Sequence, residues 1–213
     1  MIRLESQLMR LTRDIIEAAA GAPRFVLGIT GPPAAGKTTI ARGVVTDLAT
    51  LFGDDAVGYV PMDGFHLATD VCRRLGRAGR RGAPDTFDVD GFIALLRRVR
   101  HPGRTIYAPD FDHIHAHPVA AALIIPAAAR FVVVEGNYLA LDGDWQSVRD
   151  LIDTVWFIDA PDPLRRRRLL ERHVAAGRTP EDALAWIQTV DDPNAQLIRA
   201  TIHRCDVVID GGD

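Results

Sequence analysis

Lysine is almost absent from this chain of 213 residues. Lysine and arginine together number 25, and Lys37 is the one lysine, so the other 24 basic residues are arginines. A chain that otherwise carries its positive charge on arginine must have a need at position 37 that arginine does not meet. The formal net charge of −3 argues against a general binder of polyanions, so we expect no nucleic-acid partner.

Cysteine and long apolar runs are also scarce. Cys72 and Cys205 are the only cysteines and show no CxxC spacing, which favours two free thiols in a reducing compartment over a disulfide framework. The most apolar run, residues 118–134, is interrupted by Pro126 and Arg130 and is too short to span a bilayer. The charged N-terminus has no apolar signal-peptide core. We therefore expect a cytoplasmic protein without a membrane partner.

Short apolar runs alternate with amphipathic stretches along the chain. Several runs are apolar throughout, which is typical of parallel strands that are buried on both faces. The pattern predicts a single domain over residues 1–213, with a doubly wound parallel α/β sheet of about five strands. The expected strands are 25–30, 56–63, 104–112, 130–136, 154–160 and 206–210, and the expected helices are 1–20, 37–52, 90–100, 162–176 and 180–204.

The stretch GITGPPAAGKTT, residues 28–39, contains the lysine and matches G-x-x-x-x-G-K-[ST] without a gap. It lies between a predicted strand and a predicted helix, as this phosphate-binding motif requires. Backbone N–H groups and the helix N-terminus surround the phosphates, and a compact ammonium fits where a planar guanidinium is too broad. We predict a nucleoside triphosphate site, with the hydroxyl of Thr38 available to Mg²⁺. Its residues are Gly31, Pro32, Pro33, Ala34, Ala35, Gly36, Lys37, Thr38 and Thr39.

Two classes of nucleotide-binding protein fit the rest of the chain poorly. GTPases read guanine through an N-K-x-D loop, and there is no lysine outside position 37. Large ATP-driven motors usually carry further domains, for which 213 residues leave no room. A small-molecule kinase is the remaining interpretation.

Two carboxylates follow apolar strands, Asp63 in MDGFH and Glu135 in VVVEGNYL. In an open parallel sheet, ligands bind beyond the carboxyl ends of the strands. Asp63 is there a candidate general base for an attacking hydroxyl, and Glu135 can hold Mg²⁺ through water or orient the substrate. The alternative for Asp63 is a turn residue that satisfies its own backbone.

An arginine-rich segment, PDPLRRRRLLERHVAAGR, occupies residues 161–178. Arg165, Arg168 and Arg172 fall at i, i+3 and i+7, on one face of the predicted helix. This face is either solvated or closes over the triphosphate as a lid. We expect a lid over about residues 162–180, in which Arg168 and Arg172 stabilise charge on the transferring phosphoryl group.

GPPAAGKTT, MDGFH, RRGAPDTFD, YAPDFDH, VVVEGNYL and the arginine-rich segment occur in this order in one family. They resemble the phosphate-loop kinases that include uridine kinase, phosphoribulokinase and bacterial pantothenate kinase. The resemblance is greatest to the branch described as fructose transport system kinases and related nucleoside kinase-like proteins. The resemblance covers roughly residues 20–210. It implies that Asp63 is the catalytic base, that Glu135 is a second active-site acid and that the arginine-rich helix is the lid. The segments after Asp63 and Glu135 differ from those of uridine kinases, and both flank the acceptor pocket.

The segment FDHIHAHP, residues 111–118, leaves three interpretations open. His113, His115 and His117 at a period of two would share one face of a strand and could form a metal site. In the family the segment corresponds to a substrate loop, so Asp112 or His113 could contact the acceptor. A plain loop is the third interpretation.

Other polar residues are candidates for the acceptor pocket on weaker grounds. RRGAPDTFD, residues 80–88, has the composition of a turn, and Arg81 or Asp88 could contact an anionic or polyol substrate. Asn194 belongs to a region that lies near the active site in the family, although a helix kink at Pro193 would also explain it. The full set of acceptor candidates is His66, Arg81, Asp88, Asp112, His113, Asn137 and Asn194.

Together these patterns predict an ATP-dependent kinase that uses Mg²⁺ and phosphorylates a hydroxyl of a small molecule. We expect a sugar or sugar-like alcohol as acceptor, with a nucleoside or a pantothenate-like compound as the second choice. The alternative from another class is a regulatory protein that binds ATP without transferring its phosphate, and such a protein would not need a base like Asp63. The sequence leaves the oligomeric state open, a homodimer included.

Overall fold

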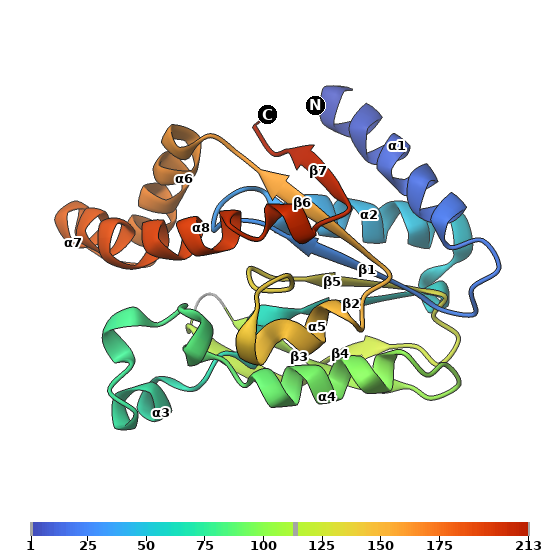
Figure 1. Ribbon diagram of the computed structural model, residues 1–213, viewed down its shortest axis with the longest axis horizontal. Helices are drawn as coiled ribbons and strands as arrows, with labels where there is room; N and C mark the ends of the chain where they lie inside the picture. Colours follow the sequence, from blue (N-terminus) through green and yellow to red (C-terminus); the bar gives the residue numbers. More distant parts are fainter. Residues whose placement is uncertain (1, 113–114, 213) are drawn as a thin grey trace.

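A five-stranded parallel sheet forms the centre of the molecule (Figure 1). The computed structural model describes residues 2–112 and 115–212. The strand order is β2-β5-β1-β6-β7, and every neighbouring pair is parallel. This confirms the predicted doubly wound α/β fold. The strands are β1 (Phe25–Thr30), β2 (Val57–Pro61), β5 (Phe131–Glu135), β6 (Thr154–Asp159) and β7 (Val207–Asp210).

Helices cover both faces of the sheet, as the all-apolar strands predict. Successive side chains of a strand point to opposite faces. Leu27 accordingly packs in one core cluster beneath α1 (Ile2–Ala18) and α2 (Lys37–Phe52), and Val26 packs in the other beneath α4 (Val89–Val99). Figure 1 shows α1 and α2 on one side of the sheet and α4 on the other. The sheet is thereby fixed from both sides, and its strand ends are rigid supports for a site.

The strand expected over residues 104–112 exists but lies outside the parallel sheet. It forms β3 (Ile106–Asp112), which pairs antiparallel with β4 (His117–Ile125), a strand that the sequence analysis did not predict. A parallel neighbour requires a long crossover, whereas only residues 113–116 separate these two strands, so a hairpin is the accessible pairing. The hairpin packs against β2 and the turn that follows it.

The arginine-rich region forms helices that lie beyond one end of the sheet (Figure 1). The single helix expected over residues 180–204 is divided, because a π-helical turn interrupts it before Pro193. Proline cannot donate the N–H of a regular helical hydrogen bond, and π turns of this kind often occur at functional sites. The elements are α6 (Asp162–Ala175), α7 (Pro180–Trp186), the π turn η6 (Ile187–Asp191) and α8 (Asp192–Arg199).

Short helices and single turns complete the fold. Within residues 2–112 and 115–212, no helix has both the length and the apolar character needed to cross a bilayer. The short elements are α3 (Thr69–Arg74), α5 (Gln146–Arg149), η1 (Asp54–Ala56), η2 (Met62–Phe65), η3 (Ala78–Arg80), η4 (Pro84–Thr86), η5 (Gly143–Trp145) and η7 (Ile202–Arg204).

Candidate active site

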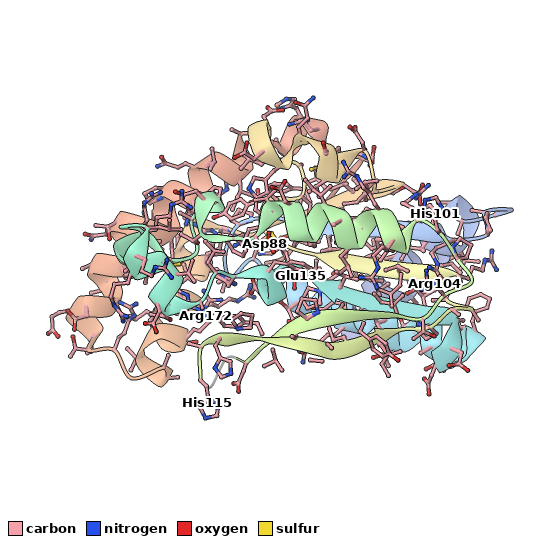
Figure 2. All side chains as sticks on the ribbon, turned by 90° about the horizontal axis from the view of Figure 1, so that it is seen from below. Asp88, His101, Arg104, His115, Glu135 and Arg172 are labelled. Atoms are coloured by element: carbon pink, nitrogen blue, oxygen red, sulfur yellow. The ribbon has the colours of Figure 1, made fainter. Side chains whose placement is uncertain are left out.

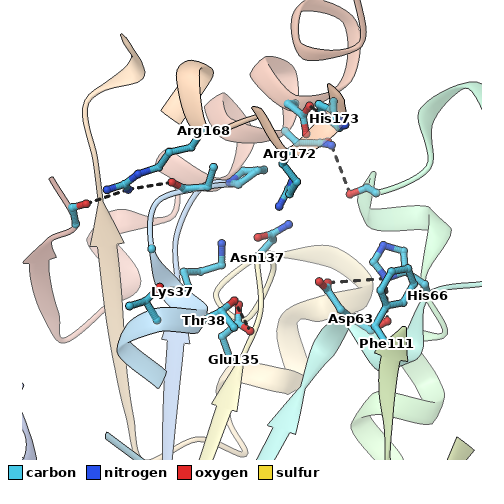
Figure 3. Close-up of a pocket in the computed structure, with 18 of the residues that line it drawn as sticks. Lys37, Thr38, Asp63, His66, Phe111, Glu135, Asn137, Arg168, Arg172 and His173 are labelled. Carbon is cyan, nitrogen blue, oxygen red and sulfur yellow. Dashed lines mark hydrogen bonds and ion pairs between the residues drawn. The ribbon is translucent and has the colours of Figure 1, made fainter. Parts of the chain in front are cut away.

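The predicted phosphate loop connects β1 to α2, so its amides lie at the N-terminus of a helix in the centre of the sheet. Lys37 is the first residue of α2, and its side chain is buried. Its Nζ donates a hydrogen bond to the carbonyl of Pro32, at 3.0 Å. Burial lowers the pKa of Lys37 to about 8, although the carboxylates of Glu135 and Asp63 oppose this shift. The lysine is therefore held inside the loop as a compact charge, with Glu135 nearby (Figure 3).

Glu135 ends β5 beside the first turn of α2, and it is buried. Its Oε2 accepts hydrogen bonds from Thr38 Oγ1, at 3.3 Å, and from the hydroxyl of Tyr59 in β2, at 3.2 Å. Burial raises the pKa of Glu135, while nearby Lys37 lowers it. Neutral hydroxyls orient this carboxylate without neutralising it, so it remains available to a cation.

Asp63 lies in η2, directly after β2. Its side chain is 39% exposed, and its Oδ1 lies 3.8 Å from His66 Nδ1, which also contacts the backbone carbonyl of Asp63 at 2.8 Å. Figure 3 shows Asp63 on the opposite wall of the cleft from Lys37 and Thr38. The carboxylate is therefore open to the cleft.

Two glycines allow the strand ends to approach one another. A Cβ at Gly136 would lie 2.4 Å from the Cβ of Met62, and a Cβ at Gly64 would lie 2.5 Å from the carbonyl oxygen of Pro109. Both distances are too short for any other residue. Gly136 lets the end of β5 meet the turn after β2, and Gly64 lets the hairpin lie on that turn. The glycine after Glu135 and the glycine after Asp63 are therefore needed to bring the two carboxylates into one site.

One cleft of about 780 Å³ contains most of the predicted site residues (Figure 3). Residues from the phosphate loop, β5, η2, the loop after η3 and the helices of the lid region line it. The predicted residues in its lining are Pro33, Ala34, Gly36, Lys37, Thr38, Thr39, Asp63, His66, Arg81, Glu135, Asn137, Arg168, Arg172 and Asn194.

Some acceptor candidates do not belong to this cleft. Asp88 is not among the lining residues, and its carboxylate caps α4 by accepting from the amide of Gly91, at 2.9 Å. Asp112 is not among the lining residues either, and its carboxylate accepts from the amide and the ring of His115. Figure 2 shows Asp88 at the end of α4 and His115 at the outer tip of the hairpin. His113 lies outside the described residues.

The metal interpretation of the histidine segment includes His113, which lies outside the described residues, so it stays a prediction. Within residues 2–112 and 115–212, no group of three histidine, cysteine or carboxylate side chains is arranged to hold a metal ion. His117 Nδ1 instead contacts the carbonyl of His115. The hairpin contributes Phe111 to the cleft, next to His66, with ring centroids 4.8 Å apart.

The three arginines with common helical spacing differ in their surroundings. Arg165 is 1% exposed and is held by Asp162 and by the carbonyl of Pro33, at 2.8 Å. Arg168 Nη1 bridges the carbonyls of Ala34 and Gly211, at 3.3 and 3.2 Å. Arg172 extends into the cleft (Figure 3), and among the described residues its guanidinium has neither a hydrogen bond nor an ion pair. Arg165 supports the loop, and Arg172 is available to a ligand.

The sequence analysis missed several residues around the cleft. Tyr59 faces Glu135 because its backbone pairs with Val133, two residues before the glutamate on the same face of the sheet. His173 Nε2 contacts Asp191 Oδ2 at 2.8 Å and ties α6 to the π turn. Tyr59 could have been found only with knowledge of the strand register. The pair between His173 and Asp191 requires the π turn, for which the sequence has no clear signal.

Comparison with known proteins points to one family. The model of the phosphoribulokinase / uridine kinase family matches residues 26–213. A Schizosaccharomyces pombe protein named "Putative uridine kinase" is 29% identical over 202 residues, which cover 91% of this chain and 86% of that protein. Pantothenate kinase of Enterococcus faecalis is 32% identical over 210 residues, with coverage of 88% and 68%. The crystal structure of a "putative fructose transport system kinase" from Silicibacter sp. TM1040 has a TM-score of 0.86 at 28% identity, covering 95% of this chain and 98% of that one.

Proposed function

The chain belongs to the phosphoribulokinase/uridine kinase family, and on this premise we propose that it phosphorylates a hydroxyl group of a sugar or sugar-like alcohol. It is a kinase that acts on a small molecule and uses ATP with Mg²⁺, as members of this family do. This decides against a regulatory protein that only binds ATP. The identity of the acceptor and the roles of the individual residues are the proposed part.

The proposal rests on the exposed carboxylate of Asp63, which lines the same cleft as Lys37 and Thr38. A carboxylate beyond the γ-phosphate accepts the proton of the acceptor hydroxyl as the oxygen attacks phosphorus, while the bond to the β-phosphate oxygen breaks and ADP leaves. A protein that only bound the nucleotide would gain nothing from this acid. His66 lies beside this carboxylate, with its Nδ1 3.8 Å from Asp63 Oδ1.

The residues beside the phosphate loop suit Mg²⁺, which prefers oxygen ligands. The hydroxyl of Thr38 and the carboxylate of Glu135 are 3.3 Å apart and provide such oxygens. We propose that they hold the ion, Glu135 through water, with Tyr59 orienting the carboxylate. When bound, Mg²⁺ offsets negative charge on the phosphates.

The lid arginines receive separate roles. Arg172 has the free guanidinium in the cleft, and we assign to it the stabilisation of charge on the transferring phosphoryl group. Arg168 was expected to act in the same way. Its bonds to the carbonyls of Ala34 and Gly211 instead support a role in holding the phosphate loop against the C-terminal segment. It lines the cleft and remains a candidate for phosphate contact.

Polar groups in the acceptor end of the cleft favour a substrate with several hydroxyls. Asn137 and His66 line the cleft, and both offer hydrogen bonds that a polyol would match. The similarity to the Silicibacter protein, which covers nearly the whole chain, adds to this. A nucleoside is the second candidate, because the rings of Phe111 and His66 could stack on a base. A pantothenate-like compound is the third, by similarity to the Enterococcus enzyme.

ATP consumption across matched acceptors tests the proposal. The full chain would be incubated with Mg²⁺·ATP and, separately, with sugars, sugar alcohols, nucleosides and pantothenate, and the phosphate ester would be identified by mass spectrometry. We expect the highest kcat/KM with a sugar-like alcohol. Preference for a nucleoside or pantothenate would replace the acceptor in the proposal, and ATP hydrolysis without any ester would contradict it.

We retain the cytoplasm as the proposed compartment. Cys72 and Cys205 are both free thiols, which suits a reducing environment. The charge of −3 and the small-molecule cleft give no reason to propose a nucleic-acid partner.

A further inference from the structure

We infer that the acceptor carries an acidic group, a carboxylate or a phosphate, and that Arg81 binds this group. The inference rests on the proposed function and narrows its substrate class to an acidic sugar-like alcohol. It starts from the charge of Arg81, for which the described residues provide no counter-ion.

The arginines of the loop after α3 differ in their ion pairs. Arg77 and Arg80 both pair with Asp85, at 3.3 and 2.6 Å. Arg81 has no carboxylate within ion-pair distance in the part of the chain that the structure describes. It is also the one of these three arginines that lines the cleft. A positive charge directed at a binding site without its own counter-ion is suited to a negative charge on the ligand.

Neutral groups orient the guanidinium of Arg81. Its Nη1 donates to Thr69 Oγ1, at 3.1 Å, and its Nη2 donates to the carbonyl of Ala116, at 2.7 Å. Its Nε is buried and has no partner among the described residues. A guanidinium has five N–H donors, and these contacts use two of them. The group is therefore positioned but neither neutralised nor saturated.

Arg81 lies on the acceptor side of the cleft. Its guanidinium is 5.7 Å from the centroid of the Phe111 ring, which is 4.8 Å from the ring of His66. His66 in turn contacts Asp63. This unbroken series of side chains leads from the proposed base to Arg81. An acceptor with its hydroxyl at Asp63 would extend along this wall and present its far end to the guanidinium.

The loop that carries Arg81 is held in place before any ligand binds. The carbonyl of Gly82 accepts hydrogen bonds from the hydroxyl of Tyr138, at 2.5 Å, and from Asn194 Nδ2, at 3.4 Å. The amide of Gly82 donates to the buried Thr86 Oγ1, at 2.9 Å. Preorganised charge loses less entropy on binding, which increases the affinity for a matching anion. Asn194 also links this loop to α8.

The competing interpretation is that Arg81 only supports the hairpin through Ala116. In that case a neutral replacement would change stability but would not change the affinity for anions. Binding of inorganic phosphate distinguishes the two interpretations when the protein is saturated with Mg²⁺ and a non-hydrolysable ATP analogue. The phosphate loop is then occupied, so added phosphate cannot bind there.

The experiment compares the unmodified chain with Arg81→Gln, Arg81→Lys and the matched control Arg80→Gln. We expect phosphate to bind the unmodified chain and Arg80→Gln equally. In Arg81→Gln its affinity should fall by about 10–100-fold, the loss expected for hydrogen bonds to a charged group, and Arg81→Lys should recover part of it. Unchanged affinity for the nucleotide analogue would show that Arg81→Gln is folded.

Acceptor pairs that differ in one acidic group, such as sugar alcohol against sugar acid and sugar against sugar phosphate, identify which anion is recognised. Equal affinity of Arg81→Gln and Arg80→Gln for phosphate, or no phosphate binding by the unmodified chain, would overturn the inference. The proposed function fails in a different way, by the absence of any phosphate ester, so the two failures remain distinguishable.

Discussion

The two halves of the cleft are built from different kinds of structure. The nucleotide half comes mainly from one continuous stretch between β1 and α2, at the centre of the sheet, with Glu135 at the end of β5 beside it. Arg165 of α6 fixes this stretch by a hydrogen bond to the carbonyl of Pro33. The acceptor half is assembled from η2, the loop after η3, the end of β3 and α8. Of these elements, none is a strand of the parallel sheet. Changes in the second half can therefore alter the acceptor while the phosphoryl-transfer groups stay in place.

The two halves of the cleft also differ in the substrates that they bind. The family uses ATP with Mg²⁺, and a rigid loop with a single compact lysine suits them. An acceptor differs from one kinase to another, and the loop that carries Arg81 and the hairpin that carries Phe111 can differ with it. We therefore expect substitutions in the nucleotide half to change nucleotide affinity, and substitutions in the acceptor half to change acceptor binding or turnover while nucleotide affinity stays the same.

The largest effect is expected at the border of the two halves. Asp63→Asn retains the size of the side chain but cannot accept a proton. Because general base catalysis contributes about 10²–10⁴-fold, kcat should fall within this range. Turnover with the best acceptor would be compared with that of Asp90→Asn, an exposed residue of α4 that should behave like the unmodified chain. Normal turnover of Asp63→Asn would move the base elsewhere, with Glu135 next in line.

A substitution confined to the nucleotide half comes next. Lys37→Arg preserves the charge, but a guanidinium does not fit the buried space that Nζ occupies beside Pro32. We expect nucleotide affinity and kcat/KM to fall on the order of 100-fold, as measured by calorimetry and steady-state kinetics. The affinity for inorganic phosphate at Arg81 should not change. A variant with normal nucleotide affinity would contradict the account of the single lysine.

Substitutions of the two lid arginines should have different kinetic effects, because the two side chains make different contacts. Arg172→Ala should lower kcat by about 10–100-fold with little change in acceptor KM, since it acts on the transferring group. Arg168→Ala should mainly weaken nucleotide binding, because it releases the loop from Gly211. Kinetics and nucleotide affinity of both variants would be measured together. If both retain normal values, these arginines form a solvated helix face.

The smallest effect concerns pH and the nucleotide half. The pKa of Lys37 is about 8, lowered mainly by burial, and the ammonium is the form that binds phosphate. ATP affinity should therefore have its full value below pH 8 and should fall above pH 8, by up to about tenfold per pH unit. Binding should also take up a proton near pH 8.5, which calorimetry in buffers of different ionisation heat detects. The stability of the nucleotide-free protein depends on pH in the opposite direction to its ATP affinity. The folded state binds fewer protons above pH 8, so this group makes stability rise with pH until the unfolded lysine also titrates.

The sequence predicted the nucleotide half better than the acceptor half, for a physical reason. The phosphate loop is contiguous, so its spacing alone specifies a turn, a helix N-terminus and a charge. Asp63 and Glu135 follow buried strands, and strand ends in a parallel sheet must meet at one edge. Both inferences required only local patterns and one rule of topology.

The acceptor half depends on contacts between distant segments, which no local pattern encodes. Asp88 has the composition of a turn residue whether it contacts substrate or caps α4. The apolar run that became β4 could not be assigned to hairpin, sheet or helix by periodicity. Phe111 reaches the cleft only because Gly64 lets the hairpin approach, and this contact is visible in the structure alone.

Nucleotide affinity of Asp63→Asn tests the separation of the two halves most directly. The phosphate loop and Lys37 hold the phosphates without Asp63, so the affinity for Mg²⁺ with a non-hydrolysable ATP analogue should stay within about twofold of the unmodified chain, although turnover is lost. Calorimetry on the two proteins side by side gives the answer. A loss of nucleotide affinity that parallels the loss of turnover would contradict the account, because Asp63 would then be part of the nucleotide or metal site rather than the base of a separate acceptor site.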